Sequence, residues 1–248
     1  MSTRQQRWDL KQFRKDVEAL FGRDQVALLN PCLASLHDRR EFARMQYQEA
    51  ERLCQDFMAD RVEDEDAVML LALGASDDSG EFVHTTKRAE GHMVAFLESL
   101  YAMSDTLGHV IYFGLGANLD GATRLPERKV SLWTVANQLE GRSAVAGLAH
   151  AVNALTSHKD YVYAAALTNH CKHRSVVGVP YTFNLVPREK GGYLHGLQFK
   201  HFRYGQEVYP PRWVSDVMPQ EYVRQTRLVV KIGNELNGAL AKRIRETG

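Results

Sequence analysis

The feature that most limits how this chain can fold is the spacing of its apolar residues, which recur every three or four positions over most of the sequence. Residues 219–245 show the pattern most fully, with apolar positions at Val229, Ile232, Leu236, Leu240 and Ile244. This spacing puts the side chains on one face of an α-helix. Pro219 lies where that helix would start, a position that proline favours. The sequence therefore predicts a mainly helical protein that ends in a long amphipathic helix.

Similar spacing predicts helices along the rest of the chain. They are expected at residues 8–21, 37–61, 66–73, 82–116, 131–139, 144–155 and 160–174. A turn is expected at Leu29–Leu33, because Pro31 disfavours helix at the preceding Asn30. The residues Asp77–Gly80 have the composition of a loop. The simplest arrangement is a bundle of five to seven helices.

The residue pattern changes after Gly178. Residues that favour strands gather at 179–186 and 193–204, on either side of the turn-forming run Glu189–Gly192. Two such runs around a glycine turn predict a β-hairpin. We therefore expect a mainly α protein with a β-hairpin inserted before its C-terminal helix.

The sequence predicts one domain rather than two. Neither an internal repeat nor a linker composition is evident in residues 1–248. The β insert, 179–210, is too small and too closely flanked by helices to form a domain of its own. We expect a single helical domain over residues 1–248, in which residues 1–80 supply N-terminal helices.

The overall composition is that of a globular protein. Of the 248 residues, 44% are hydrophobic and 25% are charged, and 31 Lys and Arg against 30 Asp and Glu give a formal net charge of +1. These values exclude a disordered chain and give no whole-molecule attraction for nucleic acid. The charges are nevertheless segregated, with acidic residues concentrated in 49–78 and basic ones in 172–174, 188–203 and 224–245. A basic face for RNA and an acidic-to-basic contact between subunits both remain open.

The sequence favours a cytoplasmic protein. Its apolar runs are too short to cross a bilayer, and no apolar stretch follows the basic residues near the amino terminus. Cys32, Cys54 and Cys171 are odd in number and widely spaced, which argues against a disulfide framework and a cysteine zinc site. We therefore expect a reducing compartment and no contact with a membrane.

The densest polar cluster is Thr168–Arg174, at the end of a predicted helix. Asn169 lies four residues before His173 and three before Lys172, so these side chains project from adjoining faces. Together with Arg174 they could hold a phosphate while His173 exchanges a proton. The same basic residues also suit the negative end of a helix dipole, which leaves a purely structural role open.

A second candidate cluster is Ser104 and Asp105, inside an otherwise apolar helical stretch. A buried aspartate needs a partner, and Lys172 or Arg174 would serve. The pair would then either contribute to a ligand site or form an ion pair in the core.

These residues resemble a known group. A helix with a central Ser104-Asp105, a second helix with Asn169, Lys172, His173 and Arg174, a β-hairpin and a final helix are similar to bacterial helical bundles of the HEPN superfamily (higher eukaryotes and prokaryotes nucleotide-binding). The resemblance covers roughly residues 80–245.

The resemblance implies a homodimer that acts as an interaction or binding module, with a protein, RNA or nucleotide as partner, in a defence or stress system. Many such domains instead cleave RNA without metal, through an Arg-x4–6-His motif on a helix. Here Arg188 and His195 have six residues between them, but Gly191 and Gly192 put the pair in the hairpin turn. Arg88 and His92 are separated by only three residues.

Two sets of site residues follow from the clusters and the resemblance. His173 and Arg174 are the candidate catalytic residues, with His173 as acid and base, and Asn169, Lys172, Ser104 and Asp105 are the candidate ligand-binding residues. We expect neither a cofactor nor a metal, because the neighbouring pair His170 and His173 lacks the further ligands that zinc prefers. An enzyme would require His173 and Arg174 to open onto an accessible cleft near Asp105, whereas burial of both in ion pairs would favour a structural role.

Overall fold

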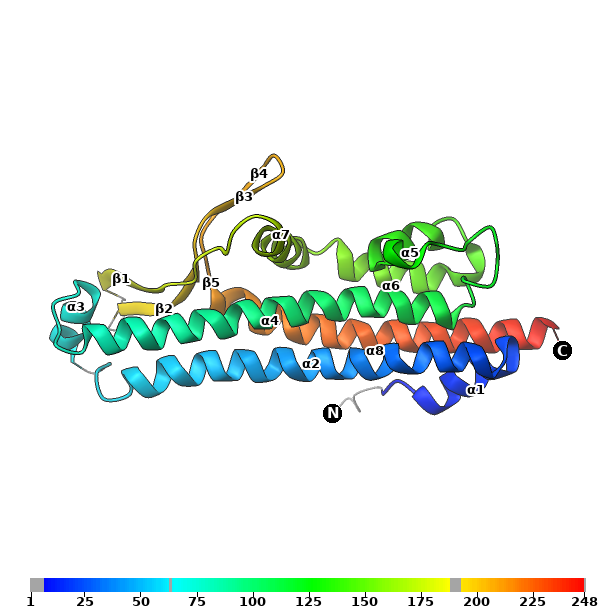
Figure 1. Cartoon of the computed structure of the whole chain (residues 1–248), viewed down its shortest axis with the longest axis horizontal. Helices are drawn as coiled ribbons and strands as arrows, with labels where there is room; N and C mark the ends of the chain where they lie inside the picture. Colours follow the sequence, from blue (N-terminus) through cyan, green and yellow to red (C-terminus); the bar gives the residue numbers. More distant parts are fainter. Residues whose placement is uncertain (1–6, 63, 188–192, 248) are drawn as a thin grey trace. The chain divides into compact units, whose positions relative to one another are not determined.

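The computed structural model describes residues 7–62, 64–187 and 193–247 and is mainly helical, as the sequence predicts (Figure 1). The described part holds eight α-helices, one more than the upper end of the expected range. They are α1 (Leu10–Phe21), α2 (Arg23–Met58), α3 (Glu65–Ala72), α4 (Ser79–Gly114), α5 (Leu132–Leu139), α6 (Ala146–Thr156), α7 (Lys159–His173) and α8 (Val214–Thr247). Short 3-10 helices, η1 and η2, lie at Glu127–Lys129 and Ser143–Val145.

Two helices run through prolines that the sequence pattern treats as boundaries. The turn expected at Leu29–Leu33 is wrong, because α2 continues through Pro31. Leu29, Leu33 and Leu36 lie on one face of α2 and are only 0%, 4% and 6% exposed. Burying each leucine is worth about 1.5–3 kcal/mol, which together outweighs the roughly 3 kcal/mol cost of proline inside a helix. Likewise, α8 begins at Val214 and includes Pro219.

The chain divides into two compact units. Unit 1 comprises Met1–Arg40, Leu100–Val162 and Val223–Gly248, and unit 2 comprises Glu41–Ser99 and Tyr163–Tyr222. The helices α2, α4, α7 and α8 each supply residues to both units. The two units are therefore described separately below.

In unit 1, close backbone contacts join the helices. A Cβ at Gly108 of α4 would lie 2.5 Å from the backbone nitrogen of Leu132, so α4 and α5 touch where only glycine fits. The segment before α1 is held on α8 in a similar way. Trp8 covers Gly233, and its indole nitrogen donates a hydrogen bond to Asn237 at 3.2 Å.

In unit 2, an apolar cluster joins α2, α3, α4 and the first strand. Its buried members are Phe57, Met58, Val68 and Leu71. Phe82 of α4 packs at the edge of this cluster, with its ring centroid 5.4 Å from that of Phe57 and 5.6 Å from that of Tyr181. The side chain of Phe82 thereby links the helices of unit 2 to its sheet.

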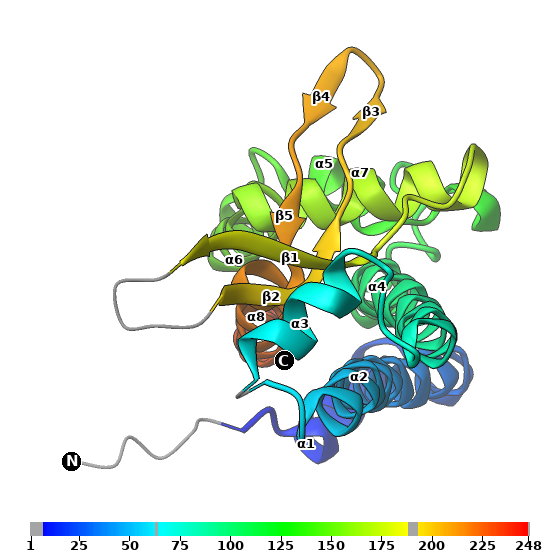
Figure 2. The ribbon, with the colours of Figure 1, turned by 90° about the vertical axis from the view of Figure 1, so that its left-hand side faces the viewer.

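The β segment of unit 2 contains the predicted hairpin and a second, smaller one (Figure 2). Its described residues form the strands β1 (Tyr181–Pro187), β2 (Tyr193–Phe199), β3 (Phe202–Tyr204), β4 (Glu207–Tyr209) and β5 (Arg212–Trp213). Strands β1 and β2 pair antiparallel and β5 adds to β2, whereas β3 pairs antiparallel with β4 in a separate sheet. The run 193–204 is thus split between two sheets, and the turn expected at Glu189–Gly192 lies outside the described residues.

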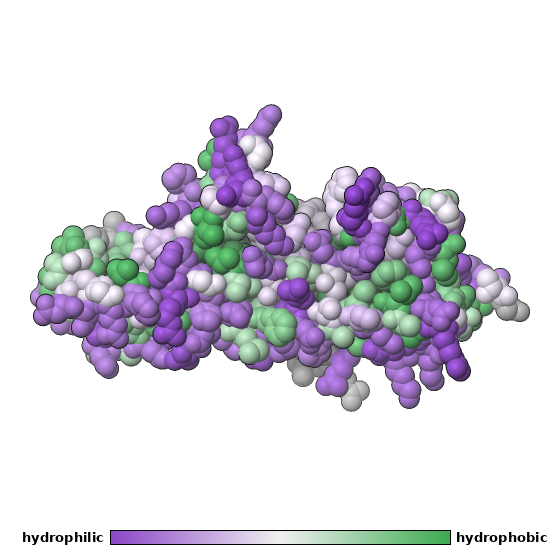
Figure 3. Space-filling view, viewed as in Figure 1, coloured by the Kyte–Doolittle hydropathy of each residue, from purple (hydrophilic) through white to green (hydrophobic). Residues whose placement is uncertain are grey.

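Among the described residues, none of the helices combines the length and the apolar character needed to cross a bilayer. Figure 3 accordingly shows a mainly hydrophilic face with apolar side chains in separate patches.

Candidate functional site

The predicted cluster of Ser104 and Asp105 lies on α4 in unit 1. Ser104 is 1% exposed, and its hydroxyl donates a hydrogen bond to the side-chain oxygen of Gln225 at 3.2 Å. Asp105 is partly buried. Ser104 therefore helps to fix α4 against α8, because a buried hydroxyl is costly without a partner.

The predicted cluster Thr168–Arg174 lies at the end of α7 in unit 2. Asn169 is partly buried, whereas Lys172, His173 and Arg174 are exposed. Arg174 donates a long hydrogen bond of 3.4 Å to the backbone oxygen of Arg203. The predicted partnership of Asp105 with Lys172 or Arg174 would join the two units and stays a prediction.

Unit 1 contains a groove of about 1410 Å³, which we call the cationic groove. Four of its lining residues are Lys or Arg, and among its described lining residues none is Asp or Glu. The cations are Arg7, Arg40, Arg227 and Lys231, and His37 lies among them. A cleft lined by one sign of charge concentrates ligands of the opposite charge.

Helical spacing explains why these cations face one space. Arg227 and Lys231 are four residues apart on α8, and Asn234 follows after three, so the three side chains share one face. On α2, His37 and Arg40 are likewise three residues apart and share one face. The two helices therefore present basic residues to the same groove.

The floor of the cationic groove is apolar. Leu33, Leu36 and Met103 line it and are 4%, 6% and 1% exposed. Two polar atoms of the lining residues, the Thr226 hydroxyl and the Asn234 amide nitrogen, are buried without a hydrogen-bond partner among the described residues. Since such atoms cost about 1–3 kcal/mol each, a ligand group that binds them would be stabilised.

Unit 2 contains a smaller pocket of about 320 Å³, which we call the acidic pocket because the carboxylate residue Glu51 lines it. Cys54 and Met58 of α2 form one wall and Tyr181 and His195 of the sheet form another. The Tyr181 hydroxyl and His195 Nδ1 are 2.6 Å apart and share a hydrogen bond. This bond fixes the edge of the pocket at the β1–β2 pair.

Burial keeps two titratable groups of the acidic pocket, the Cys54 thiol and the Tyr181 hydroxyl, in their protonated form. It raises the pKa of the Cys54 thiol to about 12, with a smaller contribution from the neighbouring Glu51 carboxylate. Burial also raises the pKa of the Tyr181 hydroxyl. Cys54 is therefore a poor nucleophile near neutral pH, since the thiolate is the reactive form.

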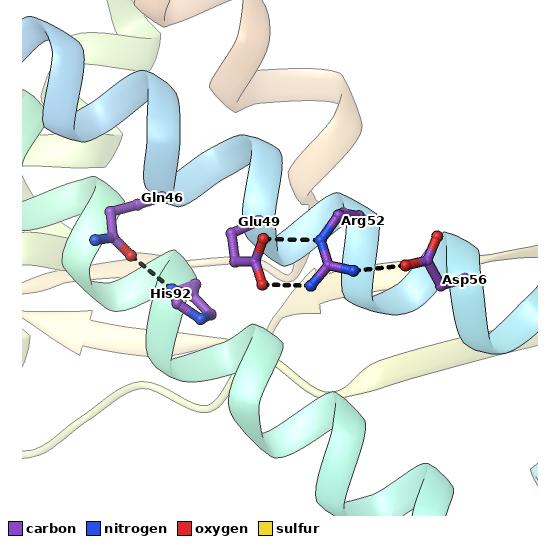
Figure 4. Close-up of polar contacts among 5 residues, drawn as sticks. All are labelled: Gln46, Glu49, Arg52, Asp56 and His92. Atoms are coloured by element: carbon purple, nitrogen blue, oxygen red, sulfur yellow. Dashed lines mark hydrogen bonds and ion pairs between the residues drawn. The ribbon is translucent and has the colours of Figure 1, made fainter.

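A polar network on α2 and α4 stands outside both cavities (Figure 4). Arg52 donates to both oxygens of Glu49, at 2.6 and 2.9 Å, and to Asp56 at 2.7 Å. The hydrogen bond from Arg52 lowers the pKa of the Glu49 carboxyl. Gln46 and His92 join the two helices through a 2.6 Å hydrogen bond. The exposed bonds of Arg52 follow one face of α2, whereas the Gln46–His92 bond is partly buried between two helices; both indicate a structural role.

No protein-family model, curated protein or solved structure matches the chain. The resemblance to HEPN bundles therefore stays a prediction, and the function must be argued from the chain itself.

Sequence reasoning did not find either cavity. The basic run 224–245 was a usable signal for the α8 side of the cationic groove. Nothing in the sequence pairs that run with residues 33–40, because the contact depends on how the helices pack. The sequence held even less indication of the acidic pocket, since lining residues such as Cys54 and His195 lie far apart in the chain.

Proposed function

We propose that this protein is a self-associating interaction module in which the cationic groove of one copy binds α3 of a second copy. The observation that carries the proposal is the lining of the groove, where four cations and no described carboxylate surround an apolar floor. Such a surface fits an acidic amphipathic helix, whose apolar face fills the groove while its carboxylates meet the rim.

The helix α3 has the complementary character. Asp64 and Asp66 are exposed at its start. Val68 and Leu71 are buried and hold the helix on unit 2. Three further apolar side chains are 37%, 46% and 68% exposed, namely Met69, Leu70 and Leu73. Figure 3 shows apolar side chains at the surface in the part of the view where Figure 1 places α3.

The size of the groove favours a helix over a metabolite. Pockets for small molecules generally span about 300–1,000 Å³. The cationic groove, at about 1410 Å³, is larger and is lined mainly by α2, α8 and the segment before α1, with Leu10 of α1 and Met103 of α4. Reciprocal binding of α3 by two copies fills both grooves and closes the assembly as a symmetric dimer.

The sequence supports this proposal in two further ways. Acidic and basic residues are concentrated in different parts of the chain, as an acidic-to-basic contact between copies requires. The resemblance to HEPN bundles also implies a homodimeric module of defence or stress systems. We also propose a cytoplasmic location, supported by three free cysteines.

Reversal of charge tests the self-association. We expect a dimer by analytical ultracentrifugation, and Lys231→Glu or Asp66→Lys alone should weaken it about tenfold or more through like-charge repulsion. The chain that carries both changes should recover the dimer, because the charges are then exchanged. Lys15→Glu, an exposed change on α1 outside the groove lining, is the matched control and should leave the dimer intact. A concentration-independent monomer mass for the wild-type chain would reject the proposal, as would a double variant that fails to recover.

A second candidate function is RNA cleavage without metal, and one observation favours it. The side chains of Lys172, His173 and Arg174 are all exposed, so a phosphate could reach them. His173 would exchange the proton while Arg174, Lys172 and Asn169 bind the phosphate.

The test is RNA cleavage in the presence of a chelator. The wild-type chain should cleave, and His173→Ala should lower the rate at least 100-fold, the usual contribution of a general acid or base. His201→Ala changes another exposed histidine and should have no effect. Equal rates for wild type and His173→Ala, or no cleavage at all, would exclude this function for the site.

A further inference from the structure

The acidic pocket of unit 2 plays no part in the proposed self-association. Its volume of about 320 Å³ lies at the lower end of the range for small-molecule sites. Most of its wall is apolar, with Met58, Val62, Leu197 and Val214 among the lining residues. A compact ligand with an apolar body would fill this space and bury the apolar surface of the wall away from water.

The charge in this pocket is opposite to that of the cationic groove. Glu51 lines it, and no Lys or Arg is found among its described lining residues. In the part of the chain that the structure describes, Glu51 accepts a hydrogen bond from Tyr47 and no cation pairs with it. A carboxylate has about four acceptor positions, so most of the capacity of Glu51 is available to a ligand.

Two titratable groups beside Glu51 in the pocket are uncharged. The Cys54 thiol and the Tyr181 hydroxyl keep their protons at neutral pH, as described above. The partly buried carboxylate of Glu51 therefore lies in the same pocket as two uncharged groups, an environment that disfavours anions and favours an ammonium group.

We propose that the acidic pocket binds a small organic amine, with its apolar body against Met58 and Leu197 and its ammonium group on the carboxylate of Glu51. The aromatic ring of Tyr181 in the wall also suits a cationic or aromatic ligand. This site is separate from the self-association, which uses unit 1 and α3.

Three probes with the same ring and different charge test the proposal. Tryptamine carries an ammonium group, indole is neutral and indole-3-acetate carries a carboxylate. By isothermal titration calorimetry, tryptamine should bind at least tenfold more tightly than indole, and indole-3-acetate should bind most weakly. Glu51→Gln should lower the affinity for tryptamine about tenfold and leave that for indole unchanged, because it removes the charge and keeps an acceptor for Tyr47.

A matched variant and the ligand series separate charge recognition from a general effect on folding. Glu49→Gln, on the same helix and outside the pocket lining, should leave tryptamine binding unchanged. The proposal is overturned if no probe binds at millimolar concentration. It is also overturned if indole-3-acetate matches tryptamine, or if Glu51→Gln weakens indole and tryptamine equally.

Discussion

The thiol of Cys54 shows, at the scale of a single residue, how burial sets side-chain chemistry. The residue is 7% exposed, and its pKa is raised from 9.0 to about 12. Above pH 9 the unfolded chain loses this proton while the folded chain retains it. The stabilisation due to the protonated thiol is therefore complete below pH 9 and is lost as the pH rises toward about 12.

Urea unfolding measured over a series of pH values checks the direction of this effect on stability. Between pH 8.5 and 10.5 the free energy of unfolding of the wild-type chain should fall more steeply than that of Cys54→Ala. The difference in slope should approach about 1 kcal/mol per pH unit once the unfolded thiol is ionised. Other titrating groups are common to both proteins and cancel in the comparison. Parallel curves would contradict a thiol that keeps its proton in the fold.

The residue scale is also where sequence reasoning was weakest. The pattern identified Ser104 as a polar residue in an apolar helix, but its partner Gln225 is 121 positions away in the chain and could not be inferred. The cluster around His173 was selected by spacing along one helix, which says nothing about exposure. The residues around Cys54 and Glu51 in the sequence do not predict a pocket there, because its other walls come from distant parts of the chain.

At the scale of secondary-structure elements, contacts between helix backbones are critical to unit 1. Gly108→Ala would place a methyl group 2.5 Å from the backbone nitrogen of Leu132 and force α4 and α5 apart. We expect a loss of about 1–3 kcal/mol in the free energy of unfolding, measured in urea.

Gly91→Ala is the control for this prediction, since it lies on the same helix with nothing within 4 Å of the added Cβ. Alanine is a better helix former than glycine, so this variant should gain about 0.5–1 kcal/mol. A loss of similar size in both variants would show that the close contact at Gly108 has no special role.

Most elements could be predicted from the sequence, because apolar spacing is a local signal. The stretch 131–139 corresponds to α5, and 160–174 corresponds to α7 within one residue at each end. The errors fall at Pro31 and Pro219, where burial on the helix face overrides the local preference of proline. The splitting of 193–204 between two sheets was also hidden, since strand pairing depends on partners elsewhere in the chain.

At the scale of the whole molecule, a net charge of +1 conceals two local environments of opposite sign. The cationic groove in unit 1 has no carboxylate among its described lining residues, and the acidic pocket in unit 2 has no Lys or Arg among its own. Sequence composition gives only the sum of these charges. The mainly α fold class could be predicted from the sequence, whereas the two cavities could not, because each collects residues from several distant segments.

The division of the chain into units has a consequence for how the protein can be dissected. Unit 1 is built from three separate segments and unit 2 from two, and the helices α2, α4, α7 and α8 pass from one unit to the other. A gene fragment that encodes one continuous stretch of residues thus cannot supply either unit whole. Expression of unit 1 alone would require its segments to be rejoined by new linkers, and every truncation that removes one unit also cuts long helices of the other.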